Sequence, residues 1–394
     1  MNSAENKGKI AIVVVGYNRL LSLQRLVSSL EKAIYEEDDV PLVISIDASG
    51  DEDLYDWARN YEWRFGRKYV IIQKERLGLK RHIFACADLT KYFKGIILLE
   101  DDLFVSPYFY HYVQSALNYY YDDVDVASIG LYSYASNIYS ALPFTPFQTD
   151  YDVYGIQATI TWGECWNERM WNDFKEWLSS NEPIQWDTID IPVAVKQFKR
   201  AWSKFFTAYM AETHRFVIVP YKSYTTNYTE AGEHSDETTS CVQVPYVRRK
   251  EVIKCGQIES LVKYDSFFDP IGLENYLQVP QNDLCVDLFS TRPNNRNCRY
   301  MLTTDVLPFK VVKTFGLKTR PIETNVIDNI PGYGITLYDL TIPDSCNKRE
   351  TNTIGSIKYR LQMFRPLLLC KYIRIYIKKE ILRKIKSLFK CKNS

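Results

Sequence analysis

Several common sequence features are missing from this chain of 394 residues. It has no run of about 18 apolar residues, so the sequence predicts no ordinary membrane-spanning helix. The first nine residues are polar, with no apolar stretch behind a basic start, and we expect no secretory signal. Its nine cysteines include no Cys-x-x-Cys pair, and Cys86 and Cys165 lie in apolar stretches where a reduced thiol packs as a small hydrophobe. These features indicate a protein of the reducing cytosol.

The glycine-rich phosphate-binding motifs are also absent. Neither Gly-x-Gly-x-x-Gly nor Gly-x-x-x-x-Gly-Lys-Ser/Thr occurs, which excludes a dinucleotide fold or a P-loop of the usual kind. The formal net charge is only +1, so composition does not indicate a nucleic-acid partner. That small total conceals a strongly basic stretch of about forty residues at the C-terminus.

What is present is an alternation of buried strands and amphipathic helices. The run Ile10–Val15 is β-branched without polar alternation, which is typical of a strand buried on both faces of a parallel sheet. Leucines then recur at helical spacing from Leu20 to Leu30, with Ser22 as the expected N-cap. Further strands are expected at 42–46, 69–73 and 95–99, each separated from the next by a helix. We therefore predict an α/β fold with a mostly parallel sheet flanked by helices.

Polar residues gather where these strands end. Gly16-Tyr17-Asn18 follows the first strand, Asp47 the second, and the acidic triplet Glu100-Asp101-Asp102 the fourth. In open parallel sheets, ligands bind beyond the carboxyl ends of the strands. Adjacent carboxylates raise one another's pKa and resist burial, so a compensating cation or sugar hydroxyl is expected beside the triplet. The alternative is a solvated turn, because acids also favour turns.

With these residues in place, the chain resembles GT-A glycosyltransferases, and specifically bacterial family 2-type polysaccharide glycosyltransferases distantly similar to the N-acetylglucosaminyltransferase I group. Four blocks carry the resemblance, and the first three keep the family's order and spacing. They are Val13–Arg19, Ser45–Asp47, Leu98–Pro107, and Val219–Asn227 followed by Ala231–His234.

The resemblance implies a role for each matching residue. Gly16, Tyr17 and Asn18 would line the base pocket of a nucleotide-sugar donor, and Asp47 would face the nucleoside. Asp101 would contact the ribose or the donor sugar. Asp102, the last acid of a DXD-like triplet, would hold Mn²⁺ or Mg²⁺ on the two phosphates.

Two further donor-side contacts are less specific. Arg81 and His82 follow the Gly78 loop and are candidates to touch the donor, although roles on the helix surface fit them as well. His234 could give a second contact to the metal or the phosphates, with a solvated loop histidine as the alternative.

The sequence departs from the family at the catalytic base. Similar enzymes carry Trp-Asp before a returning strand, and that acid would deprotonate the acceptor hydroxyl. Here the corresponding pair is Trp202-Ser203, and serine cannot act as that base. Asp187, in Trp186-Asp187, and Glu233 are the candidates that remain, each with a plain surface role as the alternative.

The C-terminal third has a different character. Short strands separated by turn clusters predict a β-rich accessory region over residues 251–350, after a catalytic domain over 1–250. Residues 351–394 form a basic tail, which we interpret as an amphipathic helix that binds an anionic membrane surface. A solvated basic helix or an RNA-adhesive tail is the alternative.

The resemblance implies metal-dependent chemistry with inversion at the anomeric carbon. The predicted function is a glycosyltransferase that moves a hexose or N-acetylhexosamine from a nucleotide sugar, with a UDP-sugar favoured. The expected acceptor is a cell-surface polysaccharide or lipid-linked oligosaccharide at the inner face of the cell membrane. A nucleotidyltransferase, or a catalytically inactive sugar-nucleotide-binding module, is the alternative function.

Overall fold

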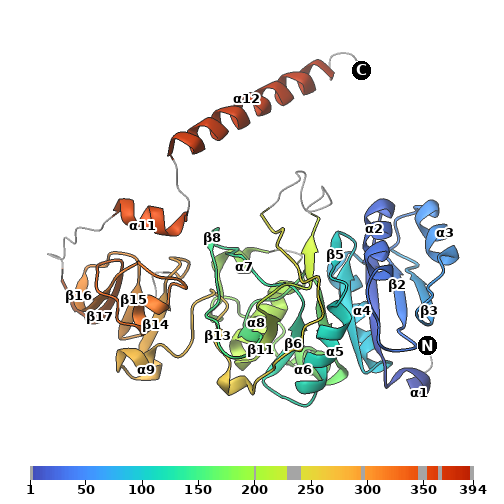
Figure 1. Cartoon of the computed structure of the whole chain (residues 1–394), viewed down its shortest axis with the longest axis horizontal. Coiled ribbons are helices and arrows are strands. Elements are labelled where there is room, and N and C mark those ends of the chain that lie inside the picture. The colour runs from blue at the N-terminus through green and yellow to red at the C-terminus, as the bar shows by residue number, and fades with distance from the viewer. Residues whose placement is uncertain are drawn as a thin grey trace.

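The computed structural model describes residues 3–198, 201–228, 241–293, 298–344, 353–362 and 366–390. Figure 1 shows a large sheet with its helices, followed along the chain by a smaller β-rich region and two terminal helices. This is the predicted α/β architecture with a separate β-rich region, and that prediction is confirmed.

The first half of the large sheet is built from four parallel strands in the order β3-β2-β1-β4. All seven residues of β1 are buried, as are the five of β2, which is why their sequences are mostly Ile and Val without polar alternation. The strands are β1 (Ile10–Gly16), β2 (Leu42–Ile46), β3 (Lys68–Ile72) and β4 (Gly95–Glu100). The predicted strands are therefore present to within a residue or two at their ends.

The second half adds five strands beyond β4, in the order β10-β6-β11-β9-β13. Strand β10 runs antiparallel to both β4 and β6, so the parallel pattern is broken at the middle of the sheet. The strands are β6 (Val126–Gly130), β9 (Val153–Ile156), β10 (Glu164–Trp166), β11 (Phe216–Pro220) and β13 (Lys263–Tyr264). Because β13 pairs with β9, the large sheet continues beyond residue 250, where we expected the catalytic domain to end.

Helices connect and cover these strands. Helix α2 buries Leu23, Leu26 and Leu30 on one face, as the leucine spacing predicts. Its first residue is Leu20, however, and Ser22 lies buried inside the helix, so the predicted Ser22 N-cap is wrong. Asp51 does cap α3, since its side chain accepts a hydrogen bond from the Leu54 N–H. The helices of this region are α1 (Ser3–Asn6), α2 (Leu20–Glu31), α3 (Glu52–Asn60), α4 (Leu79–Ala87), α5 (Phe109–Tyr119), α6 (Glu168–Ser180), α7 (Val193–Gln197) and α8 (Ser203–Thr213).

Two short ribbons lie outside the large sheet. Strand β5 (Leu103–Val105), which starts directly after the acidic triplet, pairs antiparallel with β12 (Thr225–Asn227), and β7 (Ser136–Asn137) pairs with β8 (Leu142–Pro143). The first ribbon brings the fourth block of the family resemblance alongside the third.

The β-rich region is a four-stranded sheet in the order β14-β15-β17-β16. It confirms the expectation of short strands in this part of the chain. Its elements are α9 (Glu274–Leu277), β14 (Leu284–Asp287), β15 (Tyr300–Thr303), β16 (Phe309–Phe315), α10 (Thr324–Ile327) and β17 (Ile335–Pro343).

One buried arginine ties the β-rich region to the large-sheet region. Arg292, which follows β14, donates hydrogen bonds from Nη1 to Asp190 at 2.8 Å and from Nη2 to Asp265. Its Nε lies 3.4 Å from Asp269, and its guanidinium lies 4.0 Å from the centre of the Phe267 ring. We call Arg292 with Asp190, Asp265 and Asp269 the Arg292 cluster. It joins residues that are up to 102 positions apart in the sequence.

The chain closes with α11 (Thr353–Arg360) and α12 (Pro366–Lys390). Two apolar side chains of α12, Ile373 and Ile375, are 46% and 43% exposed and point about 200° apart around a helix of 3.6 residues per turn. The membrane-binding role predicted for the tail stays a prediction. Within the described residues, no helix is long and apolar enough to cross a bilayer.

Candidate functional site

A pocket lies at the carboxyl ends of β1, β2 and β4, where the sequence predicts a binding site. About 620 Å³ of empty space, including the part open to solvent, lies between its walls. Three of the predicted segments converge there, and a fourth stretch comes from the loop before α4. The lining residues are Val15, Gly16, Tyr17, Asn18, Arg19, Asp47, Arg76, Gly78, Leu79, His82, Glu100 and Asp101.

The acidic triplet is compensated by a single arginine. Arg19 donates from Nε to Asp101 Oδ2 at 3.2 Å and from Nη2 to Asp101 Oδ1. The same Nη2 lies 3.4 Å from Asp102 Oδ2. We call Arg19 with Glu100, Asp101 and Asp102 the Arg19 cluster. Arg19 comes directly after the predicted Gly-Tyr-Asn turn, and the sequence alone did not identify it as the partner of the triplet.

The carboxyls of the triplet sit in different environments. Burial, with the nearby charges of Asp102 and Asp101, raises the pKa of Glu100 to about 8. Burial also raises the pKa of Asp101, to about 6, although Arg19 acts in the opposite direction. The Asp102 side chain is 22% exposed and Asp101 only 6%. Asp102 is therefore more open to solvent than Asp101, although it is not among the residues that line the pocket.

Asp47 fixes the loop that forms one wall of the pocket. Its carboxylate accepts hydrogen bonds from the backbone N–H of Leu77 and Gly78, each at 2.8 Å, and of Ala48 at 2.9 Å. Gly78 has a φ of +73°, a conformation that glycine adopts without strain. Asp47 does line the pocket, as the resemblance implies, but its side chain oxygens already hold the Leu77-Gly78 backbone.

An aromatic ring and two basic side chains complete the wall. The Arg76 guanidinium lies 4.7 Å from the centre of the Tyr17 ring, which is a cation–π distance. His82 is buried and its Nε2 lies 2.8 Å from the Ser45 hydroxyl. Burial lowers the pKa of His82, which favours the neutral ring. Sequence reasoning missed Arg76, although its place two residues before the Gly78 turn was the available signal.

Not every candidate residue reaches this pocket. Arg81 turns to its own loop, because it donates to the carbonyls of Leu77 at 2.9 Å and Arg76 at 3.1 Å. Asp187 is exposed and does not line the pocket. Glu233 and His234 fall outside the described residues. The roles predicted for these four residues stay predictions.

The Trp202-Ser203 pair also lies away from the pocket lining. Trp202 is 1% exposed, and its ring centre is 5.8 Å from that of Trp166 in an aromatic core. Ser203 is the first residue of α8. The position that carries an acid in similar enzymes is thus a helix start behind a packed tryptophan.

The described residues contain no preformed metal cage. Among them, no group of three or more His, Cys, Asp or Glu side chains is arranged to hold an ion. The Arg19 cluster nonetheless sets three adjacent carboxyl groups against one guanidinium. In charge, this donor set fits a divalent cation that takes its remaining oxygen ligands from a bound phosphate or from water.

No protein-family model matches the chain. A search of curated proteins likewise finds no match.

Solved structures do match it, at low identity. S. aureus TarS 1–349 in complex with UDP-GlcNAc matches with a TM-score of 0.38 and 14% identity over 57% of this chain and 60% of that one. GalNAc-T7 with UDP, GalNAc and Mn²⁺ gives 0.39 and 15% over 55% and 43%. The Pyrobaculum calidifontis mannosyltransferase PcManGT, in complex with GDP-Man and Mn²⁺, gives 0.30 and 12% over 45% and 48%.

In each case the match spans less than two thirds of the other protein's chain. At TM-scores below 0.5 these likenesses carry no argument about what this chain does. The functional case therefore rests on the residues of the pocket.

Proposed function

We propose that this chain is a GT-A glycosyltransferase that binds a nucleoside diphosphate sugar in the pocket at the carboxyl ends of β1, β2 and β4. The observation that carries the proposal is the convergence of Gly16–Arg19, Asp47 and Glu100–Asp101 on one pocket. These segments are the ones on which the family resemblance rests, and they lie far apart in the sequence.

The pocket offers a complementary surface for each part of such a donor. The Tyr17 ring, with Arg76 beside it, supplies a face on which a nucleobase can stack. Arg19 supplies a guanidinium, which suits phosphate oxygens. The neutral His82 ring lies along the same wall. The donor would thus lie with its base against Tyr17 and its diphosphate toward the Arg19 cluster.

Asp102 would hold a divalent ion, Mn²⁺ or Mg²⁺, between the protein and the diphosphate. When bound, such an ion stabilises the negative charge that develops on the departing nucleoside diphosphate. Asp101 places a second negative charge near this site, and Arg19 holds the Asp101 carboxylate in place. Glu100, whose pKa burial raises to about 8, is mostly protonated at neutral pH and adds little charge. We propose a UDP-sugar as the preferred donor on the basis of the resemblance.

The acceptor and the stereochemistry stay proposals from the resemblance. A glycan or a lipid-linked oligosaccharide is the proposed acceptor, and inversion the proposed outcome. The described pocket lining includes no carboxyl group besides those of Asp47, Glu100 and Asp101. Asp47 already accepts three backbone hydrogen bonds, so it is poorly suited to act as a base toward the acceptor hydroxyl.

The experiment is a thermal-shift series with UDP-, GDP-, CDP- and dTDP-sugars, each with and without Mn²⁺. Ligands that bind only the folded state raise the melting temperature by mass action. We expect a shift with a UDP-sugar that needs Mn²⁺ and is lost in Asp102→Asn. Asp56→Asn, an exposed acid on α3 paired with Arg59, is the matched control and keeps the shift.

The reaction products separate the proposal from its alternatives. Release of nucleoside diphosphate from the donor indicates glycosyl transfer, whereas release of pyrophosphate from a nucleoside triphosphate indicates a nucleotidyltransferase. Donor binding without any release would identify an inactive binding module, which the missing base at Ser203 makes the stronger alternative. Equal stabilisation of wild type and Asp102→Asn by the metal and donor would contradict the role of Asp102.

A further inference from the structure

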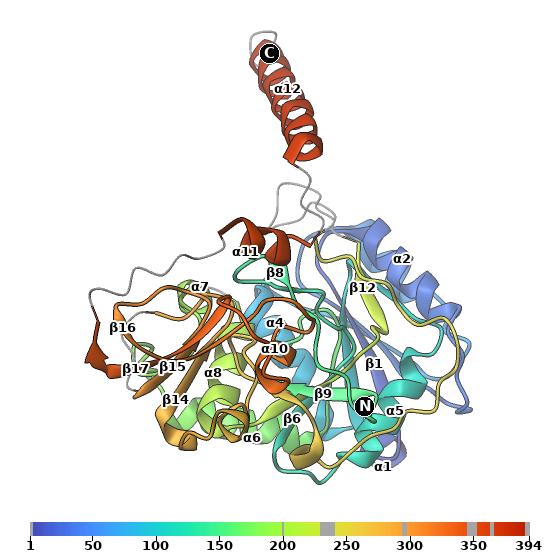
Figure 2. The ribbon, with the colours of Figure 1, turned by 60° about the vertical axis from the view of Figure 1, so that its left-hand side comes forward.

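Helix α12 leaves large apolar side chains uncovered by the rest of the described chain. In Figures 1 and 2 the helix stands away from the body of the protein in both views. Eight of its apolar side chains are between 43% and 89% exposed. They are Leu367, Leu369, Tyr372, Ile373, Ile375, Tyr376, Ile377 and Ile381. A monomeric protein rarely exposes so many neighbouring apolar groups unless something else covers them.

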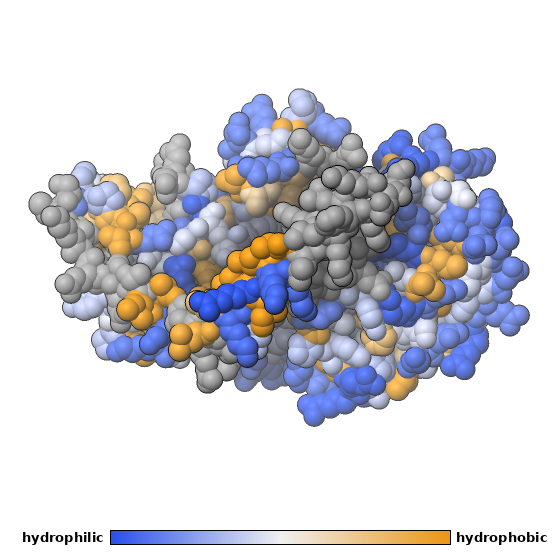
Figure 3. All heavy atoms as spheres, turned by 90° about the horizontal axis from the view of Figure 1, so that it is seen from above, coloured by the Kyte–Doolittle hydropathy of each residue, from blue (hydrophilic) through white to orange (hydrophobic). Residues whose placement is uncertain are grey.

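The polarity of α12 changes along its axis and not around it. The half 366–377 contains two basic residues, Lys371 and Arg374, among mostly aliphatic and aromatic ones. The half 378–390 contains six basic residues and the single acid Glu380. The first half is about 18 Å long at 1.5 Å per residue. A mostly apolar half is thus followed along the helix by a half rich in basic residues. Figure 3 looks onto the face of the molecule from which α12 rises, and there hydrophobic and hydrophilic residues lie next to one another.

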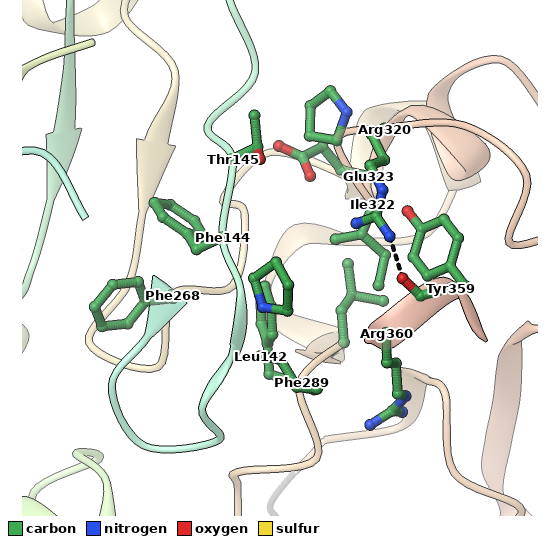
Figure 4. A pocket seen from close by; sticks show the side chains of 13 residues that line it. Leu142, Phe144, Thr145, Phe268, Phe289, Arg320, Ile322, Glu323, Tyr359 and Arg360 are labelled. Atoms are coloured by element: carbon green, nitrogen blue, oxygen red, sulfur yellow. Dashed lines mark hydrogen bonds between the residues drawn. The ribbon is translucent and has the colours of Figure 1, made fainter. Parts of the chain in front are cut away.

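Helix α11, which precedes α12, is attached to the body of the protein. Tyr359 Oη donates to the Thr319 carbonyl at 2.7 Å, and the Arg320 guanidinium lies 4.2 Å from the Tyr359 ring centre and donates to the Tyr359 carbonyl. Figure 4 shows Tyr359 and Arg360 closing a small pocket lined by Phe144, Phe268 and Phe289. The Arg360 side chain also reaches Ser290 Oγ at 3.4 Å.

This attachment restricts where α12 can begin. Four residue steps separate Gln362 from Pro366, and an extended chain covers at most about 14 Å over that distance. The start of α12 is therefore held near the α11 contact. In Figure 1, α11 and α12 lie on the side of the molecule that also carries the β5–β12 ribbon, and β5 starts directly after the acidic triplet.

The charge of α12 decides which kind of partner could cover its exposed side chains. A second copy of α12 would bring two strongly basic helices together, and like charges at short distance oppose such pairing. A nucleic acid would match the basic half but would leave the aliphatic side chains of the first half exposed. An anionic lipid surface matches both halves, because head groups attract Lys and Arg while the acyl boundary takes the apolar side chains.

We propose that α12 docks the protein onto an anionic lipid membrane, with its apolar half in the head-group and acyl boundary and its basic half among the head groups. The lysine and arginine stems of the first half reach outward to keep their charges in water. Because α11 fixes the start of α12, docking turns the edge of the sheet with the Arg19 cluster toward the membrane. The binding itself is independent of any transferase activity.

The experiment is sedimentation of the full chain with vesicles of phosphatidylcholine alone and of phosphatidylcholine with 30% phosphatidylglycerol. We expect binding to the anionic vesicles only, weakening as salt rises from 50 to 500 mM. A variant with Lys371, Arg374, Lys378 and Lys379 changed to Gln should bind about 1000-fold more weakly. A second variant, with Leu367, Ile373 and Ile377 changed to Ser, should lose binding that persists at high salt.

The matched control changes four exposed basic residues elsewhere, Lys7, Lys32, Arg59 and Lys91, to Gln and keeps the binding. Each variant should keep the wild-type melting temperature, because α12 does not pack on the body. Hydrogen exchange on the vesicles should slow in α12 and not in α3. Equal binding of the wild type and the four-charge α12 variant would overturn the proposal, as would self-association or RNA binding through α12 without vesicle binding.

Discussion

Two clusters in this protein combine one arginine with three carboxyl groups, yet they differ in what surrounds them. In the Arg292 cluster the guanidinium side chain is 8% exposed and contacts Asp190, Asp265 and Asp269 together with the Phe267 ring. In the Arg19 cluster the guanidinium is 25% exposed, holds Asp101, and leaves Asp102 partly open. Only the Arg19 cluster borders the 620 Å³ pocket.

The difference shows that composition alone does not distinguish a structural ion-pair network from a ligand site. Each nitrogen of the Arg292 guanidinium donates a hydrogen bond, with Nε donating to the Val286 carbonyl at 2.6 Å. These bonds connect the β-rich region with the large-sheet region. Arg19 serves three acids that are adjacent in the sequence, so their charges cannot separate. The partly exposed Asp102 of the Arg19 cluster is what suits a cation, whereas the Arg292 cluster holds two regions together.

The largest expected effect on stability comes from removing the arginine of the Arg292 cluster. Arg292→Leu leaves Asp265 and Asp269 buried without their guanidinium, and breaking a buried pair in this way costs about 3–5 kcal/mol. We expect urea unfolding to show a loss of this size at neutral pH. The loss should shrink in acid, because burial already raises the pKa of both carboxyls and they protonate readily.

The control is Arg59→Leu on α3, whose ion pair with Asp56 is exposed and should contribute less than about 1 kcal/mol. Equal destabilisation by the two substitutions would show that the Arg292 cluster is not a structural clamp.

Glu323 is a buried carboxyl whose hydrogen-bond partner is a tyrosine, in contrast to the arginine-paired acids of the two clusters. Glu323 accepts a hydrogen bond from Tyr264, and burial raises its pKa to about 7. Between pH 4.5 and 7 the folded protein therefore keeps a proton that the unfolded chain releases. The free energy of unfolding should fall as pH rises through this window, by at most about 3 kcal/mol.

Glu323→Gln should remove this slope and make the melting temperature flatter between pH 4.5 and 7. Glu259→Gln, a substitution of an exposed acid in the large-sheet region, should leave the slope unchanged. A slope that persists in Glu323→Gln would mean that another group binds the proton.

The smallest expected effect concerns ligand binding at the Arg19 cluster. Arg19→Gln removes a positive charge 3.4 Å from Asp102, so Mn²⁺ should bind the free protein about tenfold more tightly. The same change removes a guanidinium from the donor pocket, so nucleoside diphosphate affinity should fall about tenfold. Isothermal titration of each ligand measures both values, with Arg59→Gln as the control. If the affinities for Mn²⁺ and for nucleoside diphosphate change in the same direction, Arg19 does not oppose the metal while favouring the donor.

Much of the large sheet was predictable because its strands are buried on both faces. Such strands read as unbroken apolar runs, and β1, β2 and β4 lie where those runs predict them. The triplet and Asp47 were also found, since their position depends only on where strands end. Arg19 as the partner of Asp101 could not be found, because that contact joins residues 82 positions apart.

One error had a local cause. Ser22 is a good capping residue by type, but the helix starts two residues earlier and the serine is buried. Propensity and composition identify an element, whereas its exact start and the directions of its side chains depend on spacing and contacts.

The three backbone hydrogen bonds to Asp47 have a consequence for how the pocket would bind. They hold the Leu77-Gly78 wall in one shape before anything enters, so little ordering entropy remains to be lost on association. The Leu77-Gly78 backbone is therefore preorganised, and ligand binding should change its conformation very little.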